Sequence, residues 1–189
     1  YDRTGKILLY DVHQDIKRSI VPGSAISKNI KNAVVAIEDA DFYQHKGIKP
    51  TAILRAILVN LTSLQFEQGG STITQQVIKN TLLTSDRSIT RKIKEWILAL
   101  KLEKIMDKDS ILALYLNESP FGGNIYGIEE VSQSFFSINA SDLTIAQSAY
   151  LASLLKAPSY YSPYGKNTKK LEDRKNFVLK RMLNNNFIS

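Results

Sequence analysis

The segment at residues 69–76 constrains this chain most, because it reads Gly-Gly-Ser-Thr-Ile-Thr-Gln-Gln and runs directly into the apolar pair Val77 and Ile78. Two glycines, three hydroxyls and two amides bury little apolar surface, so core packing does not explain the segment. The glycines expose backbone amides and the hydroxyls add donors where a helix begins, which suits a phosphate or another anion. The alternative is an ordinary Ser/Thr-capped helix after a glycine turn. The basic residues Lys79 and Arg87 follow closely and favour the anion site.

The composition suits one globular domain with a basic surface. Its 189 residues are 43% apolar, which is enough for one core, and the formal net charge is +7. Such a charge suits an anionic partner, although it also serves mere solubility. The chain has no cysteine, which argues against a disulfide scaffold and a thiolate metal site. It contains no apolar run of 18 residues, no initiator Met and no signal-peptide pattern, and we read it as a piece of a longer protein.

Helical periodicity dominates the chain after residue 22, whereas residues 1–22 look extended, with a strand expected at 7–12. Ser27 and Asp142 are the expected N-caps of two helices, and residues 121–124 are expected to form a loop. Few strands and many helices predict a mostly α domain. We expect helices over residues 27–38, 52–64, 72–83, 88–105, 109–117, 128–136, 143–155 and 171–183.

Two of these expected helices carry specific predictions about their faces. The helix at 52–64 is apolar nearly all round, so it is either fully buried or faces lipid, and we favour membrane contact on one side. The helix at 88–105 is amphipathic, and its apolar side is expected to face the core. That side comprises Ile89, Ile93, Trp96, Ile97, Leu100 and Ile105.

Glu38 and Asp39 break a local rule, because acidic residues are unfavourable at the C-terminus of a helix. Such exceptions are expected at functional sites, and Glu38 is therefore a candidate general base. A solvated acidic helix end is the alternative. For His45 we expect a structural hydrogen bond, since two histidines in the whole chain do not support a metal cluster.

Three other positions carry weaker signals. Arg91 and Glu95 lie four residues apart in one helix and can pair, either at a functional site or as a plain surface ion pair. Asn117 follows a helix and could cap or orient a neighbouring loop. Lys156 is expected at a helix C-terminus, where a positive charge is favoured.

Five segments, taken in order, resemble the five motifs of the peptidoglycan glycosyltransferases, the transglycosylase domains of class A penicillin-binding proteins and their monofunctional relatives. The glycine-rich segment is the most specific of the five, and the resemblance covers about residues 25–185. The segments are residues 38–47, 69–76, 91–95, 112–117 and 156–158.

The resemblance implies a fold and an activity. It implies a lysozyme-like, mostly α glycosyltransferase domain over residues 25–189, with a small membrane-associated jaw at about residues 50–68. Residues 1–24 would form a short extended segment before it. The implied reaction polymerises lipid II into glycan strands by an inverting transfer that releases undecaprenyl diphosphate.

The resemblance also assigns roles to residues. Glu38 would be the general base on the 4-hydroxyl of the acceptor, and Glu95 would assist on the diphosphate side or hold the acceptor. Lys79 and Arg87 would neutralise the leaving diphosphate, with Arg91, Lys92 and Lys94 adding positive charge where negative charge develops. The implied substrate-binding residues are Asp39, Phe42, His45, Ser71, Thr74, Gln75, Gln76, Lys79, Arg87, Arg91, Lys94, Asn117 and Lys156.

Partners and location follow from the same resemblance. The expected partners are lipid II, the lipid-linked glycan chain, an anionic membrane surface and a C-terminal transpeptidase domain in the parent chain. We expect no nucleic acid, no metal ligands and no required cofactor, with room for a divalent cation, Mg or Mn. The expected location is the outer face of the bacterial cell membrane, anchored by a transmembrane helix before this segment.

Two departures from the family pattern keep other functions open. Ala113 stands where the family usually has Glu, and Lys49 where it usually has Asp. They leave room for a catalytically impaired relative that acts as a cell-wall assembly scaffold. A lysozyme-like lytic enzyme is a second alternative, although Lys79 and Arg87 argue against it. The charge permits a nucleic-acid binder, but the chain shows no helix-turn-helix, RNP or zinc pattern.

Overall fold

The computed structural model describes residues 17–50, 70–83 and 88–189. This part of the chain is mostly helical, as predicted, with a small three-stranded sheet. The strand expected at 7–12, the apolar helix expected at 52–64, most of the expected jaw, and Arg87 lie outside the described residues.

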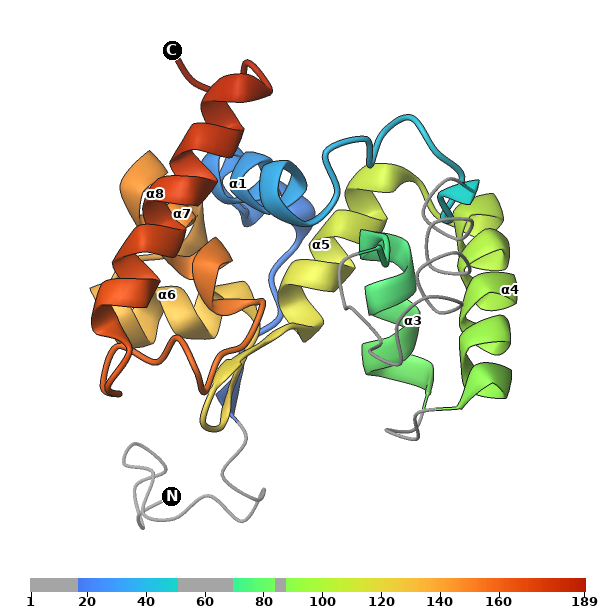
Figure 1. The fold of residues 1–189 in the computed structure, drawn as a ribbon, viewed down its shortest axis with the longest axis horizontal. Helices are drawn as coiled ribbons and strands as arrows, with labels where there is room; N and C mark the ends of the chain where they lie inside the picture. Colours follow the sequence, from blue (N-terminus) through green and yellow to red (C-terminus); the bar gives the residue numbers. More distant parts are fainter. Residues whose placement is uncertain (1–16, 51–69, 84–87) are drawn as a thin grey trace, which may run out of the picture.

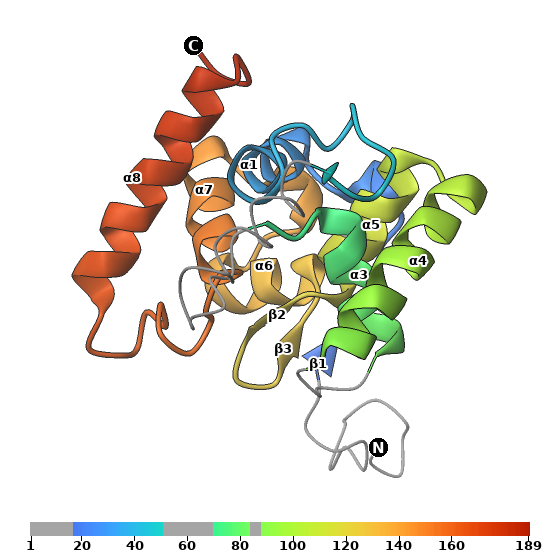
Figure 2. The same ribbon diagram turned by 45° about the vertical axis from the view of Figure 1, so that its right-hand side comes forward.

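The helices fall into two packed groups that meet at the centre of the molecule (Figure 1, Figure 2). Helices α1, α7 and α8 pack together, while α3 packs between α5 and α4. The α-helices are α1 (Lys28–Glu38), α3 (Ile73–Leu82), α4 (Ile89–Ile105), α5 (Lys108–Glu118), α6 (Ile128–Phe136), α7 (Ile145–Leu154) and α8 (Thr168–Asn184). Two 3-10 turns cover Gly23–Ala25 and Ala140–Asp142.

Most helices begin where a polar side chain caps their first turn. Ser27 accepts a hydrogen bond from the Asn29 amide at the start of α1, as predicted, and Ser88 caps α4 in the same way. Thr72 and Gln75 form a reciprocal capping box at the start of α3. The N-cap predicted for α7 was wrong: Thr144 caps this helix, because Asp142 already belongs to a 3-10 turn.

The loop predicted at residues 121–124 is instead part of a hairpin. Strands β2 (Pro120–Gly122) and β3 (Ile125–Tyr126) pair antiparallel, and β1 (Lys17–Arg18) adds to β3 in parallel, which gives the order β1-β3-β2. Strands of two or three residues are too short to show the alternation by which strands are recognised in a sequence.

The core lies between the two helix groups and within each of them. Ile30 and Val34 of α1 are fully buried, as are Leu151 of α7 and Val178 of α8. Helix α5 runs through the middle and buries Leu116 together with neighbouring apolar side chains. The core therefore holds the end of α1 against α3 and α5, where the candidate site lies.

The prediction for the inward face of α4 was wrong for all of its residues except Trp96, which is half-buried. Ile89, Ile93 and Ile97 are 74%, 46% and 48% exposed, and Leu100 and Ile105 are also exposed. The buried residues of α4 are Glu95 and Ala99, because the opposite face packs against α3 and the loop after α1. The apolar residues therefore form an outward stripe.

None of the helices among the described residues is long and apolar enough to cross a membrane.

Candidate active site

Glu38 is the last residue of α1, and its half-buried carboxylate is held from a second helix. Gln76 of α3 donates from Nε2 to Glu38 Oε2 at 3.0 Å, and the Tyr115 hydroxyl of α5 donates to Gln76 Oε1 at 3.3 Å. Burial and the nearby charge of Glu38 raise the pKa of Tyr115, so its hydroxyl stays protonated and can donate. This relay fixes one carboxylate oxygen of Glu38.

Arg174 of α8 approaches the other oxygen of the same carboxylate. Its Nη2 lies 3.8 Å from Glu38 Oε1. No motif in the sequence points to Arg174, which is one basic residue among several on the amphipathic helix α8. Local spacing carries no signal for this contact, since it depends on how α8 packs against α1.

Glu95 forms the second carboxylate group of the site, and it is 1% exposed. Arg91 Nη1 lies 3.4 Å from Glu95 Oε2, so the predicted pair is present, and Lys92 pairs with Glu95 Oε1. Lys92 also donates to Ser71 Oγ at 2.8 Å. The pair is therefore a buried link between α4 and the glycine-rich segment rather than a plain surface ion pair.

Residues 71–76 join the two carboxylate groups. Ser71 contacts Lys92 beside Glu95, and Gln76 contacts Glu38. One end of this segment thus meets a cationic cluster and the other end orients a carboxylate. Chemically, this arrangement combines an oriented carboxylate, which can act as a base, with a place where a departing anion can be stabilised.

Asp39 is buried and fastens the loop after α1 to the start of α3. Its Oδ2 accepts from His45 Nε2 at 2.9 Å and from the Ile73 amide at 3.0 Å, while Lys49 Nζ lies 2.6 Å from Oδ1. Burial alone raises the pKa of Asp39, but His45, Lys49 and the Ile73 amide outweigh it and hold that pKa below its usual range. The structural hydrogen bond predicted for His45 is confirmed.

The tautomer of His45 follows from its two contacts. The Gly47 amide donates to Nδ1 at 3.1 Å, so Nδ1 is an acceptor and Nε2 carries the proton that faces Asp39. His45 therefore supports the loop rather than facing an open site.

Three further residues of the expected site are buried. Phe42 is fully enclosed, and Gln75 is part of the capping box. The Thr74 hydroxyl donates to Glu103 Oε1 at 2.6 Å, which ties α3 to α4. Glu103, also bonded by Lys108, was not identified from the sequence. These buried side chains therefore stabilise the elements that carry the site.

Four expected residues remain among those that the structure describes, three lysines and the buried Asn117. Lys79, Lys94 and Lys156 are exposed. Asn117 accepts a hydrogen bond from the Val21 amide at 3.1 Å and donates one to the Val21 carbonyl at 2.9 Å. It therefore orients a neighbouring segment, which is one of the two roles expected for it.

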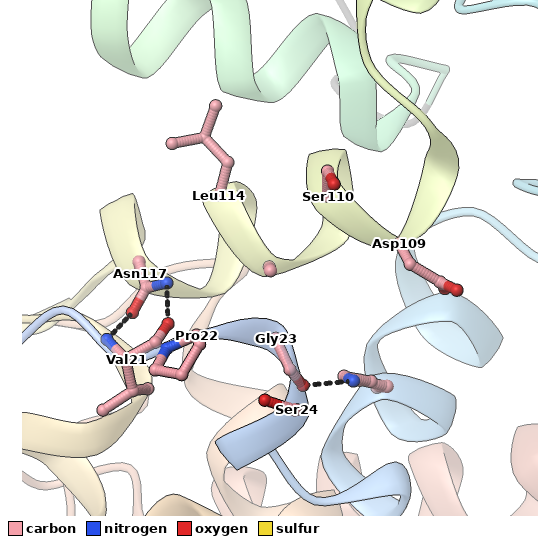
Figure 3. A pocket seen from close by; sticks show the side chains of 10 residues that line it. Val21, Pro22, Gly23, Ser24, Asp109, Ser110, Leu114 and Asn117 are labelled. Atoms are coloured by element: carbon pink, nitrogen blue, oxygen red, sulfur yellow. Dashed lines mark hydrogen bonds between the residues drawn. The ribbon is translucent and has the colours of Figure 1, made fainter.

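Asn117 also lines a pocket of about 490 Å³ between α5 and the turn at Gly23–Ala25 (Figure 3). Ala113 lies in its wall. Lys31 of α1 also lines the pocket and donates a hydrogen bond to the Gly23 carbonyl at 2.6 Å. No hydrogen bond or ion pair within the described ranges connects Asn117 to Glu38 or Glu95. Within residues 17–50, 70–83 and 88–189, no group of three or more His, Asp or Glu could hold a metal ion.

The sequence of this chain matches a family of known proteins. A family model described as Transglycosylase matches residues 5–183. The chain is 43% identical over 189 residues to a protein named Penicillin-binding protein 1A of Aquifex aeolicus, matching all of this chain and 26% of the relative. It is 39% identical over 192 residues to one of that name from Rickettsia bellii, matching all of this chain and 24% of the relative.

A protein of the same name from Clostridium perfringens strain 13 is 46% identical over 165 residues, 85% of this chain and 24% of the relative. The chain thus spans about a quarter of the length of these relatives. The match to the family model covers both carboxylate groups and the segment that joins them. The chain therefore belongs to the transglycosylase family.

Proposed function

We propose that this chain is a peptidoglycan glycosyltransferase that polymerises lipid II into glycan strands. The observation that carries the proposal is the link through residues 71–76 between an oriented carboxylate, Glu38, and the cationic group around Glu95. Membership of the transglycosylase family supports the same reaction class.

In the proposed reaction, Glu38 removes the proton from the 4-hydroxyl of the acceptor lipid II. The hydroxyl oxygen forms a bond to the anomeric carbon of the lipid-linked glycan chain. The bond from that carbon to the diphosphate breaks, and its electron pair leaves with undecaprenyl diphosphate. An inverting transfer requires the base and the leaving group on opposite sides of the anomeric carbon.

The cationic group is proposed to receive the diphosphate. Lys92 and Arg91 hold positive charge beside Glu95, and Ser71 offers a hydroxyl next to Lys92. The exposed Lys79 and Lys94 are proposed to add positive charge, and the same role is proposed for Arg87. Positive charge already in place where negative charge develops stabilises the transition state without reorganisation.

The other residues of the expected site are assigned supporting roles. We assign Asp39, Phe42, His45, Thr74 and Gln75 to holding the site in shape, because their side chains are buried or bonded to backbone. Asn117 would act through the segment it orients, and Lys156 would contact the lipid-linked glycan from the end of α7.

A divalent cation stays optional in this proposal. Lys92 and Arg91 already supply positive charge at the leaving-group side, so Mg or Mn would assist rather than complete the site. Turnover measured with EDTA and then with added Mg or Mn tests this assignment.

We place the protein at the outer face of the bacterial membrane, with an anchor before this segment and a transpeptidase domain after it in the parent chain. The exposed stripe of Ile89, Ile93 and Ile97 on α4 supports contact with a bilayer. Exposed Lys94 and Lys101 on the same helix suit anionic headgroups.

The test is polymerisation of lipid II by wild type and by Glu38→Gln. The substitution is nearly isosteric but cannot accept the proton, so we expect a loss of about 10²-fold or more in turnover with little change in Tm. Glu118→Gln is a matched control, because Glu118 also ends a helix and pairs with an arginine, Arg18, at 2.8 Å.

Near-normal polymerisation by Glu38→Gln would show that Glu38 is not the base. A folded wild type that binds lipid II without polymerising it would favour the scaffold. Cleavage of finished glycan without any use of lipid II would favour a lytic enzyme.

A further inference from the structure

Arg174 is held in place by contacts that do not involve Glu38. Its Nε donates to the backbone carbonyl of Ser153 in α7 at 3.1 Å, and its guanidinium carbon lies 5.5 Å from the centre of the Tyr161 ring. Its side chain is 12% exposed. A planar guanidinium with one edge bonded and one face near an aromatic ring has a fixed direction, and here that direction leads toward Glu38.

The contact with Glu38 is an ion pair without a hydrogen bond. Nη2 and Oε1 are 3.8 Å apart, beyond hydrogen-bond distance, whereas Oε2 accepts a true hydrogen bond from Gln76 at 3.0 Å. The two oxygens are therefore unequal. Gln76 occupies Oε2, and Arg174 attracts Oε1 without occupying its lone pairs.

This inequality matters for a base that must accept a proton from a sugar hydroxyl. A strong donor already bound to a lone pair competes with the substrate for that lone pair, while a cation slightly further away orients the carboxylate without occupying its lone pairs. The charge of Arg174 and the hydrogen bond of Gln76 act on opposite oxygens and together determine how the carboxylate is turned.

We propose that Arg174 is a positioning residue for this glycosyl transfer, which turns Glu38 so that Oε1 faces the acceptor hydroxyl. The inference rests on the proposed function, because it takes Glu38 to be the base. It predicts that loss of Arg174 slows turnover much more than it weakens binding of lipid II.

Arg181 provides a matched control on the same helix. Its Nε donates to the backbone carbonyl of Ala36 in α1 at 3.2 Å, so it also ties α8 to a neighbouring helix through one backbone oxygen. Arg181 makes no hydrogen bond or ion pair with Glu38 in the described part of the chain. A purely structural role for Arg174 would make the two arginines equivalent.

The experiment measures kcat and KM for lipid II, and Tm, in Arg174→Gln, Arg174→Lys and Arg181→Gln. We expect Arg174→Gln to lower kcat roughly 10- to 100-fold, with KM within about threefold of wild type. Arg174→Lys should recover part of that loss, because it keeps the charge but lacks the planar fork. Arg181→Gln should lower Tm to a similar extent and leave kcat close to wild type.

Three results would overturn the inference. They are a normal kcat in Arg174→Gln, equal losses of kcat in Arg174→Gln and Arg181→Gln, and a fully normal kcat in Arg174→Lys. The last of these decides the matter if Arg174→Gln does not fold. Glu38→Gln, measured alongside, separates the two proposals: if it is inactive while Arg174→Gln is normal, only the role of Arg174 fails.

Discussion

Three carboxylates of similar chemistry occupy three different environments in this molecule. Glu38 has one oxygen bonded by Gln76 and the other facing a cation, while Glu95 is enclosed by Arg91 and Lys92. Asp39 is buried, and donors contact both of its oxygens. The partners, rather than the residue type, therefore separate a candidate base from a structural anchor.

Replacing Asp39 with Asn should destabilise the fold at neutral pH. Asn cannot pair with Lys49 and leaves that cation partly buried beside a neutral group, so we expect a loss of about 2–4 kcal/mol in the free energy of unfolding. Urea denaturation of Asp39→Asn, compared with Asp173→Asn at an exposed position, measures it.

The pH dependence of the same variant has a definite sign. The pKa of Asp39 is lower in the folded protein than the ordinary 3.8, so its contribution is complete above 3.8 and is lost as the pH falls through the folded pKa. The stability difference between wild type and Asp39→Asn should therefore be constant from pH 7 to about pH 5 and shrink below about pH 4. A difference that stayed constant into strong acid would contradict this assignment.

The contacts of Lys49, which stands where the family usually has Asp, show its structural role in this chain. Lys49 lies 2.6 Å from Asp39 Oδ1 and 3.3 Å from Asp41 Oδ2. Asp, the residue usual in the family, would here add a carboxylate beside two others. Lys49 therefore strengthens the loop in this chain, and nothing in its contacts points to an impaired site.

At the scale of elements, α3 is the part on which the site depends. Its first turn is fastened by Asp39, by its capping box and by Thr72, which donates to the Gly47 carbonyl at 2.6 Å. Helix α3 also contacts α4, through the hydrogen bond that Thr74 donates to Glu103. The loop after α1 and two helices thus meet around one helix start.

Gly47 allows the loop to approach α4. Its φ is +85°, and a Cβ there would lie 2.8 Å from the carbonyl oxygen of Ala99. Gly47→Ala should cost about 2–3 kcal/mol, because it combines backbone strain with a clash against a helix backbone.

Gly123→Ala is the matched control for Gly47→Ala. Gly123 also has a positive φ, +55°, but its Cβ would meet nothing within 4 Å, so only about 1 kcal/mol of strain is expected. Thermal unfolding of both variants checks the difference, and equal losses would mean that the close approach to α4 contributes nothing.

At the scale of the whole molecule, the apolar stripe of α4 and the net charge of +7 act together. Apolar side chains flanked by lysines favour an anionic bilayer surface, and the electrostatic part of that attraction is screened by salt. We expect the protein to bind vesicles that contain anionic phospholipid more tightly than neutral vesicles, and less tightly as salt is raised.

The double variant Ile93→Asp/Ile97→Asp tests the contribution of the stripe. Both side chains are about half exposed, so the fold should tolerate the change, while vesicle binding should fall roughly tenfold or more. Sedimentation with vesicles measures it, and Thr90→Asp, at an exposed polar position of the same helix, is the control for added charge. Unchanged binding would show that another surface meets the bilayer.

The sequence alone determined the features that depend on neighbouring residues. Caps act within a few residues and helical periodicity within two turns, so α1, α3, α4 and α6 begin and end close to where they were predicted. The motif residues Glu38 and Glu95 and the segment 71–76 were recognisable for the same reason, because their order and spacing lie in the chain itself.

Only the tertiary structure decided which faces and which distant residues meet. Helix α4 turns Glu95 and Ala99 inward and its isoleucines outward, because polar contacts to α3 and the approach of Gly47 determine its orientation. Arg174 reaches Glu38 only because α8 packs against α1 and α7. A side chain's local pattern shows that it can be buried or charged, whereas its partner depends on how whole elements pack, which no short stretch of sequence records.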